Sequence, residues 1–233
     1  MRQILPNVKL YMLIIKYNQK KHKEIVRGLV HALKQGKTVV YPTDTSYGLA
    51  CDATNVRALA KIYAVKERGF NHPIHIIIPS TGYAKRIAVW EPIEVRLAEK
   101  FWPGALTLVV PLKIKRIFLK KLSGGTGTIG LRMPDQKIAL DLVKGLGAPI
   151  TATSANPSGP VGHDSYSATD VAHQFAGRKY RPDIILDAGR LSRRKPSTVV
   201  RAADGIVKIL RAGPVSKLQI KRALKRHNVR IVD

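Results

Sequence analysis

Six short polar segments of this sequence lie where a predicted strand or helix ends. They are residues 42–49, 66–68, 132, 153–159, 197–199 and 210–213. In open α/β sheets, ligands bind in the crevice beyond the carboxyl ends of the strands. Lysine and arginine side chains in such a crevice bind phosphate or carboxylate groups, and an arginine can hold two oxygens of one group. The segments together therefore predict a site for small anionic substrates.

Each segment taken alone also has a structural explanation. Thr43 and Asp44 are of residue types that shape turns. Lys66 and Arg68 suit the solvated end of a helix, and Ser154 is of a residue type that is common in loops. Only the combination favours a functional site.

Several familiar site motifs are excluded. The glycine-rich segment 125–130 spells G-x-G-x-x-G, but it follows a basic segment and continues into β-branched residues, whereas a dinucleotide site needs a strand before it and a helix after it. No Walker A motif occurs, so an ATP site must be built in another way. His72 and His75 have no further ligands at metal-binding spacing. We expect no protein-held metal site.

Hydrophobic periodicity predicts the elements that position these segments. Helices are expected at 20–35, 55–67, 93–101, 136–144 and from Ser216 onward. Strands are expected at 12–17, 38–41, 74–78, 106–110, 128–132, 148–153, 183–187, 197–201 and 206–210. Strands that alternate with helices and then cluster indicate an α/β or α+β domain, with a twisted mixed sheet flanked by helices. We expect a domain over 1–215 and a basic helical tail over 216–233.

Composition narrows the class of protein. The chain has 233 residues, enough for one substantial core, and a single cysteine, Cys51, which fits a reducing cytoplasm. No apolar run is long enough to cross a membrane, and no signal peptide is recognised. The formal net charge of +26, concentrated at both ends, predicts attraction to polyanions such as RNA. Solubility alone is the alternative explanation for this charge.

In their order and spacing, the segments resemble the YrdC-like threonylcarbamoyl-AMP synthase family. The likeness covers residues 14–213, and the chain resembles the short form, without an additional C-terminal domain. The resemblance rests on P-T-D-T-S-Y-G-L at 42–49, K-x-R at 66–68, P-G-x-L-T-L at 103–108, L-R-x-P at 131–134 and T-S-A-N-P-S-G at 153–159.

The resemblance implies a basic concave cavity that holds ATP beside L-threonine, and it assigns residues to each side. The expected ATP-side residues are Lys66, Arg68, Phe70, Thr128, Ser154, Gly162 and Arg211. The expected threonine-side residues are Thr43, His75, Arg132, Ala152 and Ser197. Catalytic roles are expected for Lys66, Arg68, Ser154 and Asn156.

The implied reaction joins L-threonine, bicarbonate and ATP into threonylcarbamoyl-adenylate and pyrophosphate, for N6-threonylcarbamoyladenosine in tRNA. Mg²⁺ is expected to arrive with ATP. Expected partners are tRNA or the tRNA threonylcarbamoyl-transferase complex, and the expected location is the cytoplasm.

Two alternative functions stay open. One is an RNA-binding module without catalysis, and the other is a carbamoyl-transfer domain of the hydrogenase-maturation type.

Overall fold

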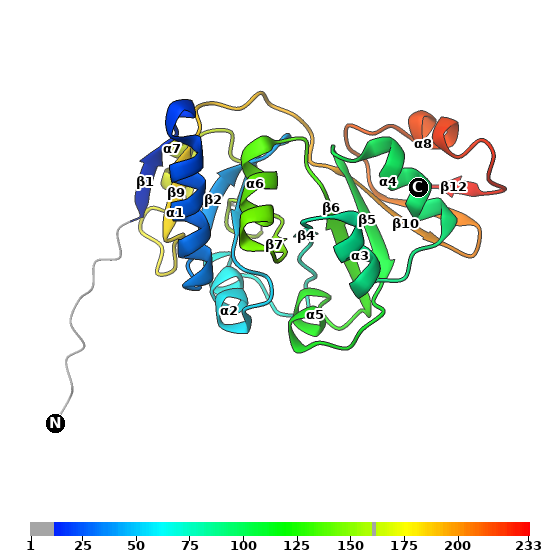
Figure 1. Cartoon of the computed structure of the whole chain (residues 1–233), viewed down its shortest axis with the longest axis horizontal. Coiled ribbons are helices and arrows are strands. Elements are labelled where there is room, and N and C mark those ends of the chain that lie inside the picture. Colours follow the sequence, from blue (N-terminus) through cyan, green and yellow to red (C-terminus); the bar gives the residue numbers. More distant parts are fainter. Residues whose placement is uncertain (1–11, 160–161) are drawn as a thin grey trace.

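The structure is a computed structural model, and it describes residues 12–159 and 162–233. The strands form two mixed sheets that stand next to each other (Figure 1). Sheet A has the order β1 (Leu13–Lys16), β9 (Ile184–Asp187), β2 (Val39–Pro42), β3 (Tyr47–Ala50), β8 (Thr153–Ser154). Sheet B has the order β12 (Arg230–Val232), β11 (Ile206–Arg211), β10 (Thr198–Ala203), β5 (Leu106–Pro111), β6 (Thr128–Arg132), β4 (Ile76–Ile77), β7 (Ile150–Thr151). The predicted α/β class is confirmed, with two sheets where one was expected.

The helices pack against these sheets. They are η1 (Gln19–Lys21), α1 (His22–Lys34), α2 (Val56–Val65), α3 (Thr81–Ile87), α4 (Pro92–Phe101), α5 (Ile117–Leu122), α6 (Lys137–Leu146), α7 (Ala168–Phe175) and α8 (Lys217–Ala223). In Figure 1, α1 and α6 lie side by side, and their apolar faces share one core cluster with β2 and β9. No helix in the described ranges is both long and apolar enough to cross a membrane.

Local sequence signals account for several element ends. The Asn55 side chain accepts hydrogen bonds from the backbone amides of Arg57 and Ala58, which caps α2 as predicted. Ser216 and Gln219 form the predicted capping box of α8. After α1 the chain turns at Gly36, whose φ of 73° is readily adopted only by glycine.

The predicted strand at 148–153 is in fact two strands in different sheets. Thr151 of β7 pairs with Ile76 of sheet B, and Ser154 of β8 pairs with Gly48 of sheet A. Ala152, between them, donates its backbone N–H to the carbonyl of His75 at 2.7 Å. The chain therefore passes from one sheet to the other at a single residue.

Sheet B has two unlike faces because side chains alternate along its strands. On one face, Leu108 of β5 and Leu131 of β6 enter the main core, to which α3, α4, α5 and α8 also contribute. On the other face, Thr107, Gly130 and Arg132 line open cavities. This second face forms the floor of the candidate site.

Five elements were not predicted: β3, α3, α5, α7 and β12. Strand β3 begins within the polar segment 42–49 and ends one residue beyond it. Helix α5 lies within a basic segment, and its only buried residues are Leu119 and Leu122. In the basic segment 216–233, only 217–223 is helical, and Arg230–Val232 adds a strand parallel to β11.

Candidate active site

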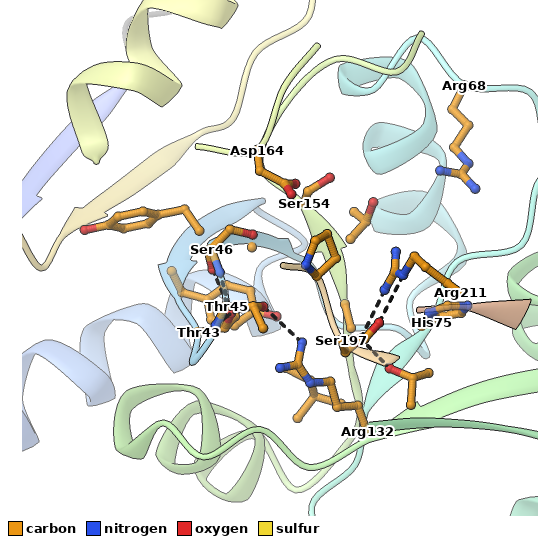
Figure 2. Close-up of a pocket in the computed structure, with 18 residues that line it drawn as sticks. Thr43, Thr45, Ser46, Arg68, His75, Arg132, Ser154, Asp164, Ser197 and Arg211 are labelled. Atoms are coloured by element: carbon orange, nitrogen blue, oxygen red, sulfur yellow. Dashed lines mark hydrogen bonds between the residues drawn. The ribbon is translucent and has the colours of Figure 1, made fainter. Parts of the chain in front are cut away.

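The first cavity lies between the two sheets and has a volume of about 180 Å³. Its lining residues come from segments far apart in the sequence, and they are predominantly polar (Figure 2). They are Tyr41, Thr43, Thr45, Ser46, Tyr47, Gly48, Arg68, His75, Ile77, Thr107, Arg132, Ala152, Thr153, Ser154, Asp164, Pro196, Ser197 and Arg211. Three guanidinium groups thus meet in a space smaller than the 300 Å³ or more typical of sites for drug-sized ligands.

A second cavity of about 370 Å³ adjoins the first on the exposed face of sheet B. Its lining residues are Pro73, His75, Val109, Thr126, Thr128, Gly130, Val199, Arg201, Leu210 and Arg211. His75 and Arg211 line both cavities. The two spaces therefore meet at an imidazole and a guanidinium group.

Arg132, at the end of β6, is the most buried of the three arginines that line the first cavity. Its Nη2 donates to the Asp44 carboxylate, its Nη1 to Thr45 Oγ1 at 3.3 Å and its Nε to the Gly104 carbonyl at 3.4 Å. A guanidinium has five N–H donors, so two of them remain for a ligand. Burial lowers the pKa of Arg132, and the nearby Asp44 opposes that shift. Arg132 remains charged because of the high intrinsic pKa of a guanidinium.

Thr43 shapes the turn between β2 and β3. Its Oγ1 donates to the Ser46 carbonyl at 2.7 Å and accepts from the backbone amides of Thr45 and Ser46. These bonds occupy most of the hydroxyl, so in the structure Thr43 has the turn-forming role that the sequence also allowed. Thr43 still lines the first cavity.

His75 is electrically neutral at physiological pH. Its pKa is lowered to about 4, chiefly by burial and then by the nearby Arg211, Arg68 and Arg132 in that order of effect. A neutral imidazole at the junction of the cavities serves as a hydrogen-bonding group and adds no charge.

Arg211 and Ser197 are bonded to each other on neighbouring strands. Arg211 donates from Nε to the Ser197 carbonyl at 3.0 Å and from Nη2 to Ser197 Oγ at 3.1 Å, and that hydroxyl also lies 2.8 Å from Thr107 Oγ1. The chain approaches this point closely at Gly213, where a Cβ atom would lie 2.3 Å from the Pro196 carbonyl oxygen.

Lys66 lies behind the cavity wall. It is 2% exposed, and its Nζ donates to the carbonyls of Ser154 and Asn156 at 2.7 and 2.6 Å. Its pKa is lowered to about 7, chiefly by burial and then by the nearby Arg68, while Asp164 opposes the shift. Lys66 therefore holds the 153–159 loop, and direct contact with phosphate stays a prediction. An ammonium group has three N–H donors, and these two carbonyls use two of them.

Arg68 reaches the first cavity and donates from Nη2 to the Pro73 carbonyl at 2.9 Å. Phe70 lies outside both cavities, 54% exposed, against Tyr63 at a centroid distance of 4.7 Å. Asn156 and Gly162 also lie outside the two cavities, and a Cβ atom at Gly162 would lie 2.7 Å from Asn156 Nδ2.

Most of the sequence-predicted site residues therefore meet in one place. The first cavity contains Thr43, Arg68, His75, Arg132, Ala152, Ser154, Ser197 and Arg211, and the second contains Thr128 with His75 and Arg211. Lys66, Phe70, Asn156 and Gly162 do not line either one. Among the described residues, no group of three or more His, Cys, Asp or Glu residues is placed to hold a metal ion.

Two acidic residues were not predicted as site residues. Asp44 is the counter-ion of Arg132, and its position directly after Thr43 in the polar segment was the available signal. Asp164 is the only carboxylate that lines the first cavity in the described part of the chain. It lies in a loop rich in turn-forming residues, and the surrounding sequence does not distinguish Asp164 from other loop residues.

The fold and the site define a class: a mixed α/β domain with a cationic cavity between its sheets and a second cavity that adjoins it on sheet B. The chain belongs to the family called Sua5_yciO_yrdC, described as telomere recombination, which matches residues 31–213.

Relatives carry a consistent description. The chain is 36% identical to the threonylcarbamoyl-AMP synthase of Bacillus subtilis, over 82% of this chain and 54% of that protein. It is 31% identical to the threonylcarbamoyl-AMP synthase of Thiobacillus denitrificans, over 79% of this chain and 94% of that protein. The chain thus spans about half of one relative and nearly all of the other. The crystal structure of P. abyssi Sua5 complexed with L-threonine matches with a TM-score of 0.81 at 32% identity, over 95% of this chain and 62% of that chain.

Proposed function

We propose that this protein is a threonylcarbamoyl-AMP synthase, a nucleotidyltransferase that forms threonylcarbamoyl-adenylate and pyrophosphate from L-threonine, bicarbonate and ATP. The observation that carries the proposal is the pair of adjoining cavities that share His75 and Arg211. The smaller cavity suits an amino acid and the larger suits part of a nucleotide. Membership of a family with threonylcarbamoyl-AMP synthases supports this reading.

L-threonine is proposed to occupy the first cavity. The two free N–H donors of Arg132 suit its carboxylate, since a guanidinium binds a carboxylate through two parallel hydrogen bonds. The hydroxyl of Ser197 faces the same space and suits the threonine hydroxyl. A buried polar group left unpaired discriminates against analogues that lack this hydroxyl.

ATP is proposed to lie over the second cavity, with its phosphates toward Arg211 and Arg68. Arg201, Thr126, Thr128 and Gly130 line that cavity. Mg²⁺ would come with the nucleotide, because it is commonly held by phosphates and water with few protein ligands. It would neutralise charge on the pyrophosphate as it leaves.

The reaction requires no covalent enzyme intermediate. The threonine amine takes up carbon dioxide, derived from bicarbonate, to form a carbamate. A carbamate oxygen then attacks the α-phosphorus of ATP, a P–O bond to the β-phosphate breaks, and pyrophosphate leaves. Two anions must meet, so the contribution of the protein is positioning and charge stabilisation by Arg68, Arg132 and Arg211.

A direct test incubates the purified protein with Mg-ATP, bicarbonate and each amino acid in turn. We expect pyrophosphate release and an acyl-adenylate with L-threonine, and far less with serine or valine. Release that is independent of the amino acid, or no release with any of them, would overturn the assignment. A cytoplasmic location, and use of the product on tRNA by a partner transferase, belong to the same proposal.

The net charge of +26 favours a second activity, binding of structured RNA through the phosphate backbone. The measurement is tRNA binding as a function of salt. A steep loss of affinity with rising salt, without any ATP turnover, would favour an RNA-binding module over an enzyme.

A further inference from the structure

The first cavity has a marked imbalance of charge. Arg68, Arg132 and Arg211 line it, and Asp164 is the only carboxylate that does so among the described residues. An amino acid is a zwitterion, so an anion that lines the cavity beside these cations complements the ammonium group of the ligand. Asp44 is excluded from this role because its carboxylate is buried against Arg132.

The backbone on both sides of Asp164 is held in place. His163 donates its N–H to Gln174 Oε1 at 3.0 Å and accepts at its carbonyl from Gln174 Nε2 at 2.9 Å. Ser165 is fully buried, its carbonyl accepts from the Tyr47 amide at 2.9 Å, and its hydroxyl accepts from Gln174 Nε2 at 2.7 Å. Gln174 of α7 thus bridges the two neighbours of Asp164.

The carboxylate itself is free to accept. No residue in the described ranges donates a hydrogen bond to the Asp164 side chain, although the residue is only partly exposed. In Figure 2, Asp164 enters the cavity from the side opposite Arg132. A ligand that spans the two would place its own carboxylate at Arg132 and a nitrogen at Asp164.

We propose that Asp164 binds the α-amino group of the amino-acid substrate. This contact selects L-threonine over hydroxy acids that lack an amine. The proposal rests on the proposed function, since it names the acceptor for the threonine nitrogen. The ammonium, the free amine and the carbamate each carry an N–H donor, so Asp164 holds the nitrogen through all three forms. It is a binding residue, because its proposed contact is a hydrogen bond to the nitrogen and takes no part in making or breaking a covalent bond.

The test compares L-threonine with 3-hydroxybutyrate, which keeps the carboxylate and the hydroxyl but lacks the amine. Binding of each is measured by calorimetry with wild-type protein and with Asp164→Asn. We expect Asp164→Asn to weaken L-threonine about 10- to 100-fold, as loss of a charged hydrogen bond does. Binding of 3-hydroxybutyrate should change less than about 3-fold. Asp204→Asn, in the turn between β10 and β11, is the control with the same change of charge.

Two further variants sharpen the test. Asp164→Glu keeps the acceptor and should recover part of the preference for L-threonine. Gln174→Leu frees the backbone around Asp164 and should weaken L-threonine more than 3-hydroxybutyrate, with Tm reporting whether the fold survives.

The inference is overturned if Asp164→Asn leaves L-threonine binding unchanged, or weakens both ligands equally. It is also overturned if the variant only raises the Mg²⁺ concentration needed for pyrophosphate release, which would make Asp164 a magnesium ligand. These outcomes leave the proposed function standing, provided that the wild type releases pyrophosphate with L-threonine. Failure of the wild type to bind L-threonine overturns both.

Discussion

At the residue scale, the central feature is a buried arginine with a built-in counter-ion. Arg132 and Asp44 are each less than 10% exposed at their side chains. A buried charge without a partner costs several kcal/mol, so Asp44 lets the guanidinium stay in the cavity before a substrate arrives. The arginine at the end of β6 was predicted from sequence. Its partner was not, because pairing across 88 residues has no local signature.

The roles of this pair can be separated by mutation. Arg132→Gln leaves Asp44 buried and unpaired, and it should lower the free energy of unfolding by about 3–5 kcal/mol. In the double variant Asp44→Asn/Arg132→Gln, stability should largely return, while the KM for L-threonine should stay about 10- to 100-fold above wild type. Urea unfolding and pyrophosphate release measure the two effects. Wild-type KM in the double variant would remove Arg132 from the threonine site.

At the element scale, the site depends on close contact between short strands. Gly130 of β6 lies against the His75 ring, and a Cβ atom there would be 2.3 Å from the ring Cδ2. Strand β4 is too short to be assigned its register from sequence, since 74–78 read only as a continuous apolar run. Long elements such as α1 and α6 were predicted well because their periodicity extends over several turns. Elements of two residues, such as β7 and β8, contain too few residues to show any period.

Gly130→Ala should push the His75 ring out of place between the two cavities. We expect a loss of about 1–3 kcal/mol in stability from overpacking and at least a tenfold fall in kcat/KM for L-threonine. Gly28→Ala in α1 is the control, because no atom lies within 4 Å of its added Cβ. His75→Ala added to Gly130→Ala should restore stability by making room. If Gly130→Ala alone keeps full activity, the position of the His75 ring is irrelevant to the site.

At the scale of the whole molecule, the buried Lys66 links stability to pH. Its pKa is about 7 in the folded protein against 10.5 as the ordinary value. Between these values the unfolded chain binds more protons at this residue, so the free energy of unfolding rises with pH. Below pH 7 both states are protonated, and the full cost of burying the charge is present.

Lys66→Met should remove this pH dependence. Between pH 7 and pH 9, the free energy of unfolding of the wild type should rise relative to the variant by about 2 kcal/mol. The window ends at pH 9 because Cys51 and the buried tyrosines, whose pKa values are raised, act in the opposite direction above it. Lys100→Met, on an exposed part of α4, is the matched control. Parallel curves for wild type and Lys66→Met would show that Lys66 stays charged.

At Ala152 the chain connects the two sheets directly beside the cavity. The residues on either side belong to different sheets, and the Ala152 amide is itself bonded to the residue at the junction of the two cavities. This bond continues the pairing of β7 with β4, so it fixes the edge of sheet B at the point where the chain leaves for sheet A. Exchange of the amide proton with deuterium reports on opening of that edge, and we expect a substrate that fills the adjoining cavities to slow it.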